Sequence, residues 1–353
     1  MRLGCAALLI VTWLRGVGVA GPHEGETPSH DPIAVVRASA SSPWIDDAPA
    51  EVLTTKSIDE PKHDYRLVSA IGLAGVYATF SAWAYIAWYR NHPEKEMHDI
   101  GSDGWFGKGT YAGGADKMGH AWATMVLARG GTAALTAGGW DRTKSAIVSA
   151  VLSEGLFFAV EMKDYYYYEF SPGDMTFNTL GALTAVALDL SPRLDELFDF
   201  RVEYWPSDQY VANLSPDSVC AKRTPGLPSC SRWNIAEDYS GETYLLAFHL
   251  GGIHRLRDME WGAASRFVDV VAGFGTRNYK PPPQMEDELH QTRSQTWFLG
   301  VSLNAQGAFD YFLEPKSKLR KAAHGLFEVL QFGGAVPLFG VRRETKTVAS
   351  GGA

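Results

Sequence analysis

An uncharged stretch of 23 residues between Arg66 and Arg90 constrains this chain more than any other feature of its sequence. At 1.5 Å per residue, a helix of that length spans the hydrocarbon core of a bilayer. Four Trp and Tyr residues gather at one end of the stretch, and these residue types favour the interface between lipid and water. We therefore expect residues 67–89 to cross a membrane. The alternative is a buried core helix.

Three weaker apolar segments follow, and we expect helices over residues 116–137, 144–162 and 172–190. Arg129 and Glu154 interrupt the first two, and a charge at mid-bilayer costs roughly 2.5–3.5 kcal/mol unless it has a partner. These helices are expected either to pack around the first helix with their polar groups inward or to lie partly at the membrane surface. Small residues crowd them, which allows close approach of their backbones.

The N-terminus is typical of a secretory signal peptide. Arg2 precedes an apolar run at residues 5–14, and residues 18–20 are small, as at a cleavage site. We expect residues 1–20 to be removed on export, the alternative being an uncleaved anchor. Residues 21–62 are rich in Pro, Ser, Asp and Glu without an apolar period, which predicts a flexible linker. The net charge of −8 argues against a nucleic-acid partner.

Two cysteines remain after that cleavage, Cys220 and Cys230, and they bracket a turn-rich loop. In an exported chain, two cysteines so close together predict a disulfide. A zinc site is not expected there, because no His or second cysteine pair lies at ligand spacing.

The pattern changes after about residue 195 to short segments rich in β-branched and aromatic residues. Strands are predicted over residues 199–205, 242–250, 266–275 and 296–305. Residues 317–332 predict one amphipathic helix, and residues 341–353 predict a disordered tail. The sequence thus predicts an α+β fold, in which a small membrane-associated helical bundle at residues 63–192 precedes a β-rich region at residues 193–340.

Polar side chains recur at helical spacing on the apolar helices. Asp116 and His120 are four residues apart at the start of one helix and share a face, with Lys117 beside them. Because burying such groups alone is costly, we expect them to pair with one another between the helices. The predicted polar cluster consists of Asp116, Lys117, His120, Glu161, Asp164, Asp174 and Asn178.

Each member of this cluster also has a purely structural explanation. Asp116 could cap its helix, and the Ser-Pro-Gly-Asp segment that ends at Asp174 has the form of a capping box. His120 could be a satisfied core histidine. Glu161 could neutralise Arg129 or Lys117.

The sequence also resembles a known family. "DKMGH" at residues 116–120 and "EMKDYYYYEFSPGDMTFNTLGA" at residues 161–182 resemble the YfiM-like family of periplasmic lipoproteins, a domain of unknown function. The resemblance covers about residues 100–190, and the β-rich part resembles the C-terminal extension of longer members. A more distant similarity is to VanZ-like membrane proteins, although the glutamine that usually follows the glutamate in those proteins is missing here. The cysteine motif that is usual in the lipoprotein family is also missing. The resemblance implies an envelope location and a polar site.

Two functions are consistent with these features. The favoured one is a non-enzymatic cell-envelope protein that binds membrane lipid or an envelope protein partner through the polar cluster. The alternative is a membrane-embedded hydrolase or transferase acting on a phosphorylated lipid. In that case Lys117 would bind phosphate, His120 would act as base or nucleophile, and Glu161 or Asp174 would orient it or hold a metal. A complete catalytic motif and a second basic cluster are both missing from the sequence, which favours the first.

The sequence predicts no cofactor and no dedicated metal site. It leaves an acidic excess in the cluster, however, that a proton, a metal ion or a cationic ligand could fill. The β-rich region is expected in the periplasm, and the choice between inner and outer membrane stays open.

Overall fold

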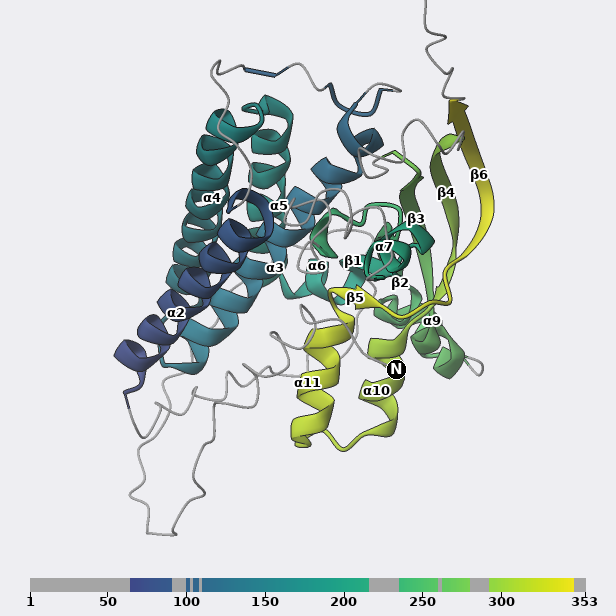
Figure 1. The fold of residues 1–353 in the computed structure, drawn as a ribbon. Coiled ribbons are helices and arrows are strands. Elements are labelled where there is room, and N and C mark those ends of the chain that lie inside the picture. The colour runs from purple at the N-terminus through teal and green to yellow at the C-terminus, as the bar shows by residue number, and fades with distance from the viewer. Residues whose placement is uncertain are drawn as a thin grey trace, which may run out of the picture. The chain divides into compact units, whose positions relative to one another are not determined.

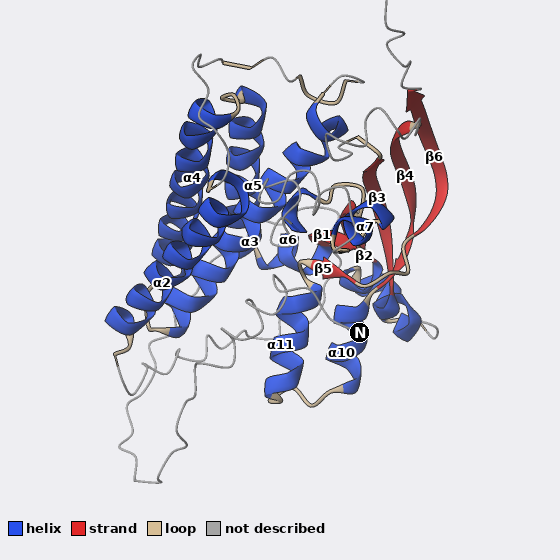
Figure 2. Cartoon of the chain, in the orientation of Figure 1, coloured by secondary structure: helices blue, strands red, loops and turns tan. Residues whose placement is uncertain are grey.

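The computed structural model describes residues 64–90, 100–101, 104–107, 110–215, 235–259, 262–279 and 292–345. Helices come first and a sheet with further helices follows, which confirms the predicted α+β class (Figures 1 and 2). The predicted signal peptide and linker lie outside the described residues. So do both cysteines of the predicted disulfide, and that pairing stays a prediction.

Four long helices make up the first part. They are α2 (Arg66–Ala84), α3 (Ala115–Ala137), α4 (Arg142–Tyr167) and α5 (Pro172–Leu190). A π-helical turn, η1 (Tyr85–Tyr89), continues α2, so the first helix ends where the uncharged stretch ends. Local caps start the last two helices: Asp141 accepts the N–H of Lys144 at 3.0 Å, and Ser171 caps α5.

The described chain contains a second candidate membrane span besides the predicted one at residues 67–89. Two helical segments of the described chain, Arg66–Tyr89 and Arg142–Tyr167, are long and apolar enough to span a bilayer. Core helices of soluble proteins share that length and composition. Length and composition alone therefore assign neither segment as a membrane span.

The sheet contains six strands of the described residues in the order β5-β1-β2-β3-β4-β6. All neighbours are antiparallel except β1 and β5, which are parallel. The strands are β1 (Phe198–Tyr204), β2 (Glu242–His249), β3 (Val268–Arg277), β4 (Arg293–Leu303), β5 (Leu330–Gln331) and β6 (Val336–Thr345). The first four overlap the predicted strand segments, while β5 and β6 are strands that the pattern did not predict.

The start of α3 packs on this sheet. Val202, Tyr244 and Phe274 lie on adjacent strands, because Val202 is in register with Tyr244 and Tyr244 with Phe274. Together with Ala115 and Tyr239 they form one core cluster. As a result α3 lies between the sheet and the other long helices (Figure 1), and the two predicted regions form one unit from Tyr65 onward.

The predicted amphipathic helix over residues 317–332 is shorter than expected. The helix α11 (Lys318–Phe327) begins after its cap, Ser317, and ends before β5. There the N–H of Val202 donates to the carbonyl of Val329 at 3.0 Å, so pairing with β1 overrides the helical periodicity.

Short helices that the sequence pattern did not predict connect the strands of the β-rich region. They are α6 (Pro192–Leu197), α7 (Asp208–Asn213), α9 (His254–Arg257) and α10 (Ala305–Phe312), with 3₁₀ turns η4 (Ile235–Glu237), η5 (Leu250–Gly252) and η6 (Gly262–Phe267). Caps formed within a few residues begin several of these elements. Asn304, for example, accepts the N–H of Gly307 and starts α10.

The predicted disordered tail is also corrected, because residues 341–345 form the end of β6. Val341 is in register with Trp297, and Thr345 with Arg293 on β4. This order depends on backbone bonds to a strand some 50 residues earlier, and the local composition carries no signal of such pairing.

Candidate functional site

The start of α3 carries the first residues of the predicted cluster. A 3₁₀ turn, η2 (Tyr111–Gly114), precedes the helix, and Gly114 has φ +89°, a left-handed conformation that favours glycine. A Cβ at Gly114 would lie 2.7 Å from the carbonyl oxygen of Trp105, so a larger residue does not fit. Gly114 occupies the cap position without a side-chain bond. Asp116 is therefore not the helix cap, and its carboxylate is directed to tertiary contacts.

His120, one turn into α3, connects this helix with α5 and α4. Its Nδ1 lies 3.0 Å from Asn178 Oδ1, which also accepts a hydrogen bond from Thr124 Oγ1 at 3.1 Å. Because the amide oxygen of Asn178 can only accept a hydrogen bond, Nδ1 of His120 carries the proton of this bond. Nδ1 also lies 3.7 Å from Glu161 Oε1, and Nε2 lies 3.9 Å from Asp116 Oδ1.

Asp174 reaches the same point from the first turn of α5. Ser171 Oγ accepts the N–H of Asp174 at 3.1 Å, so the capping box that the sequence predicts is formed. The capping does not occupy the Asp174 carboxylate, whose Oδ1 accepts a hydrogen bond from Lys117 Nζ at 3.1 Å. Gly173 makes room for this pair, because a Cβ there would lie 2.6 Å from Lys117 Cε.

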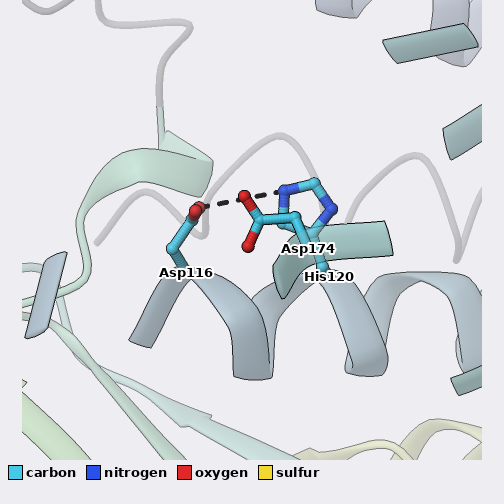
Figure 3. A group of neighbouring side chains, drawn as sticks. All are labelled: Asp116, His120 and Asp174. Carbon is cyan, nitrogen blue, oxygen red and sulfur yellow. Dashed lines mark ion pairs between the residues drawn. The ribbon is translucent and has the colours of Figure 1, made fainter. Parts of the chain in front are cut away.

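Asp116, His120 and Asp174 face one another (Figure 3). One carboxylate oxygen from each aspartate and one ring nitrogen all lie within 4.8 Å of one another. His120 is the most exposed of the three, with 15% of its side chain accessible, whereas Lys117 is fully buried. Two helices thus direct two carboxylates and an imidazole at one nearly closed point.

Glu161 lies behind the His120 ring on α4. The residue is only 1% exposed, and its Oε2 accepts the backbone N–H of Ser171 at 3.3 Å. Its Oε1 has no hydrogen-bond partner among the described residues, and neither has Nδ2 of the fully buried Asn178. A buried polar atom without a partner normally costs free energy, so both atoms call for an explanation.

Arg129 does not pair with Glu161, which removes one of the structural explanations for that glutamate. Arg129 Nε lies 3.4 Å from Asp189 Oδ1, and its Nη2 contacts Asp195 Oδ1 at 2.5 Å. A third carboxylate, that of Glu328, also pairs with Nη2. Arg129 is thus satisfied at the other end of α3.

One partner of the site comes from the β-rich region and was missed in the sequence. Tyr239, directly before β2, donates its hydroxyl hydrogen bond to Asp116 Oδ1. The two residues are 123 positions apart, and the sequence has no signal that relates them. Asp164, in contrast, does not join the His120 group, and its carboxylate accepts a hydrogen bond from the Tyr89 hydroxyl at 2.7 Å. The structure therefore brings six of the seven predicted cluster residues together and adds Tyr239.

Burial and charge shift the acid–base behaviour of the site. Burial, with the nearby charge of Asp174, raises the pKa of Asp116 to about 7. Burial lowers the pKa of His120, but the charges of Asp174, Asp116 and Glu161 outweigh it and raise that pKa to about 9. The rise at Asp116 therefore comes first from burial, and the rise at His120 from the negative charge of the carboxylates around it.

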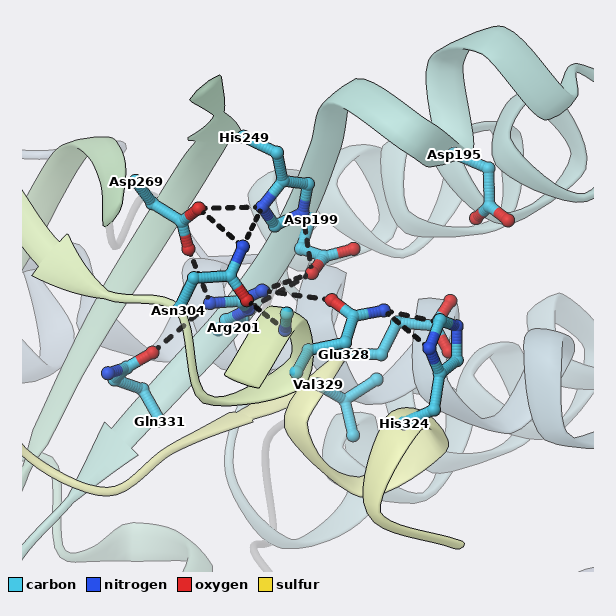
Figure 4. A network of polar contacts seen from close by, with 12 residues as sticks. Asp195, Asp199, Arg201, His249, Asp269, Asn304, His324, Glu328, Val329 and Gln331 are labelled. Carbon is cyan, nitrogen blue, oxygen red and sulfur yellow. Dashed lines mark hydrogen bonds and ion pairs between the residues drawn. The ribbon is translucent and has the colours of Figure 1, made fainter. Parts of the chain in front are cut away.

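A second buried polar network lies on the sheet (Figure 4). His249, which we regard as structural from its position at a strand end, donates to Asp269 Oδ1 at 2.8 Å and faces Asp199 Oδ2 at 2.9 Å. The fully buried Arg201 pairs with the same two aspartates, at 2.5 Å and 2.9 Å. Asn304 donates to Asp269 at 2.7 Å. The charges of His249 and Arg201 are thus paired with those of Asp199 and Asp269, which fits a structural role, although Asp199 Oδ1 has no hydrogen-bond partner among the described residues.

The comparisons with known proteins give a match for the helical part of the chain. Residues 102–190 match the family described as "Predicted periplasmic lipoprotein (DUF2279)", which confirms the resemblance drawn from the cluster motifs. The matched segment contains α3, α4, α5 and all seven predicted cluster residues. No protein with a curated description and no solved structure matches the chain.

Proposed function

Because residues 102–190 match a family of predicted periplasmic lipoproteins, we propose that this protein is a non-enzymatic component of the bacterial cell envelope. Its helical part contacts membrane lipid through the outward faces of α2, α4 and α5. The polar cluster then serves as an internal site of this domain, separate from the lipid-contacting surface.

The residue pattern of α4 is the observation that carries the proposal. Ser145, Ser149 and Ser153, spaced four residues apart, are fully buried against the neighbouring helices. The opposite face exposes Ile147 at 50% and Val151 at 65%. A helix of a water-soluble protein has the reverse arrangement, with its apolar stripe toward the core. Polar residues inside and aliphatic residues outside suit surroundings of hydrocarbon.

The neighbouring helices continue this surface. On α2, Leu67 and Ile71 are exposed, and on α5, Leu183 is exposed. Inside the bundle, Tyr77 of α2 and Ser153 of α4 are hydrogen-bonded at 2.6 Å, a polar contact of the kind that holds helices together in lipid. The apolar surface therefore extends over three helices.

The position of the sheet favours insertion into one leaflet over a complete crossing. Trp122 Nε1 donates to the carbonyl of Val329 at 2.9 Å, and further along α3 Arg129 pairs with Asp195. The C-terminal region thus flanks α3 along more than half of its length. If α2 crossed the bilayer with α3 beside it, these polar contacts would lie at membrane depth. With the helices parallel to the surface, the α2–α4 side enters lipid and the sheet stays in water.

Phosphoryl chemistry, the alternative function, finds less support. That reaction needs Lys117 to bind a phosphate, but the Lys117 side chain is fully buried and donates to Asp174. A phosphorylated headgroup would have to displace this pair and enter a closed site. The geometry of His120 beside two carboxylates is compatible with proton transfer, but a buried lysine that already pairs with Asp174 does not support phosphoryl chemistry.

Membrane binding can be tested by changing the apolar surface. We expect the triple variant Ile147→Ser, Val151→Ser, Leu183→Ser to shift the protein from the membrane pellet toward the soluble fraction, because it removes buried apolar area. A matched control is Leu338→Ser, Phe339→Ser, Val341→Ser, which alters three equally exposed apolar residues of β6. Release by the control but not by the α4–α5 variant would contradict the proposal.

The orientation of α2 is tested separately by cysteine labelling in intact membranes. Single variants Asp64→Cys and Arg90→Cys place a thiol at either end of the helix. In-plane insertion predicts that both react with a membrane-impermeant maleimide added from the same side. Reaction of only one of them would instead establish that residues 67–89 cross the membrane.

A further inference from the structure

Three donor atoms of the polar cluster have the chemistry and spacing of a metal site. An imidazole nitrogen and two carboxylate oxygens bind Zn²⁺ at about 2.0–2.2 Å, so donors on one tetrahedral ion lie roughly 3.3–3.6 Å apart. The donor atoms of Asp116, His120 and Asp174 all lie within 4.8 Å of one another. Side-chain rotations that move these atoms by up to about 1 Å would bring them onto a common ion.

The hydrogen bonding of His120 prepares the correct nitrogen for such an ion. Nδ1 donates to Asn178 Oδ1 at 3.0 Å, which leaves the lone pair on Nε2. Nε2 is the nitrogen that faces Asp116, at 3.9 Å. Histidine ligands in metalloproteins are commonly oriented in this way by an acceptor on the opposite ring nitrogen.

The unpartnered oxygen of Glu161 is an independent sign of a missing positive charge. Glu161 is 1% exposed, and its Oε1 lies 3.7 Å from His120 Nδ1 with no hydrogen-bond partner among the described residues. A cation bound at Nε2 would make the His120 ring more positive and would stabilise the carboxylate that faces Nδ1 at 3.7 Å. This electrostatic attraction accounts for an acidic group at this buried position.

The balance of charges in the polar cluster also indicates a bound cation. Asp116, Asp174 and Glu161 carry three negative charges when ionised, against one positive charge on Lys117. Buried charges are stable only when paired, so the remaining two negative charges require a dication or the uptake of protons. A proton on His120 would offset only one of them.

From this geometry we infer that Asp116, His120 and Asp174 bind one divalent transition-metal ion of the zinc type. Glu161 and Asn178 orient His120 from behind. The ion joins α3 to α5 at the point where Tyr239 also contacts Asp116. Three protein ligands leave a fourth position of a tetrahedral ion for water. The inference concerns the interior of the bundle and does not depend on the lipid contact proposed above.

Zinc binding by the full-length protein tests the inference. The chain is purified in mild detergent without a polyhistidine tag, stripped with a chelator, and titrated with Zn²⁺ alone by calorimetry. We expect one bound ion per chain and a rise of the melting temperature on addition of Zn²⁺. His120→Gln should abolish both effects. Glu161→Gln, which keeps the three ligands, should weaken binding by about 10- to 100-fold.

His324→Gln is the matched control, because His324 also pairs with an aspartate, Asp310 at 2.7 Å, but lies in the C-terminal region. It should bind Zn²⁺ like the wild type. Equal affinity in the His120→Gln variant, or binding of Mg²⁺ as tight as that of Zn²⁺, would overturn the inference. So would a wild-type protein that neither binds Zn²⁺ nor melts at a higher temperature with it. In that case protons bound to His120 and to the carboxylates offset the excess negative charge of the cluster.

Discussion

At the scale of single residues, the buried charges of this protein are satisfied by partners distant in the sequence. Lys117 meets Asp174, Arg129 meets Asp195, and Arg201 meets Asp269. Removing one partner from such a pair leaves an uncompensated charge, which is more damaging than the pair is stabilising. The stability of the fold should therefore respond to pH where one of these groups titrates.

His249 is the group for which this response is most direct. Burial lowers its pKa, but Asp199 and Asp269 outweigh the burial and raise that pKa to about 9, with Arg201 as the neighbouring cation. A raised pKa means that the stabilisation is complete below the unfolded-state value of about 6.5 and disappears as the pH rises through about 9. We expect the free energy of unfolding to fall by on the order of 3 kcal/mol between pH 6 and pH 10 from this group.

Urea unfolding across that pH range measures the effect, and variants isolate it from other titrating groups. His249→Gln should lose stability at pH 6 and show a flatter dependence. His254→Gln changes an exposed histidine paired with Glu196 and should keep the wild-type slope. An unchanged slope in His249→Gln would assign the dependence to other groups.

At the scale of elements, the close approach of α3 and α5 positions the cluster. A Cβ at Gly181 would lie 2.2 Å from the backbone oxygen of Ala121, the residue that follows His120. The small residue lets the two backbones come together, and this approach brings Asn178 within reach of His120.

Two glycine substitutions test the packing of these helices. Gly181→Ala should destabilise the protein by about 1–3 kcal/mol, because the helices must separate to admit the methyl group. Gly130→Ala, on an exposed face of α3 with no atom within 4 Å of its Cβ, should instead stabilise it by roughly 0.5–1 kcal/mol. Thermal melting distinguishes the two, and a neutral Gly181→Ala would show that the approach of the backbones is not tight.

At the scale of the whole molecule, α3 joins the helical and β-rich regions. Tyr239 contacts its beginning, Trp122 donates to Val329 further along, and Arg129 pairs with Asp195 and Glu328. Because these contacts hold one helix to several elements of the second region, we expect both regions to unfold together.

Arg129→Met tests this connection. The substitution leaves the carboxylates of Asp189, Asp195 and Glu328 without their common cation, and we expect a loss of about 3–5 kcal/mol in the free energy of unfolding. Arg193→Met is the control, because Arg193 is half exposed and pairs with Glu196 near the surface. It should cost less than about 1 kcal/mol in urea unfolding. Similar losses in both variants would contradict a special role for Arg129.

The sequence by itself determined the four long helices, the strands β1 to β4 and most members of the polar cluster. These features arise from interactions within a few residues: the helical period of apolar side chains, the cap at Ser171, and the i,i+4 spacing of Asp116 and His120. Only the tertiary structure decided which groups meet across the chain. It brought Tyr239 to Asp116, directed Asp164 to Tyr89, and turned residues 341–345 into a strand on β4. Such pairings depend on the packing of whole elements, and no local sequence pattern specifies which distant element packs against a given residue.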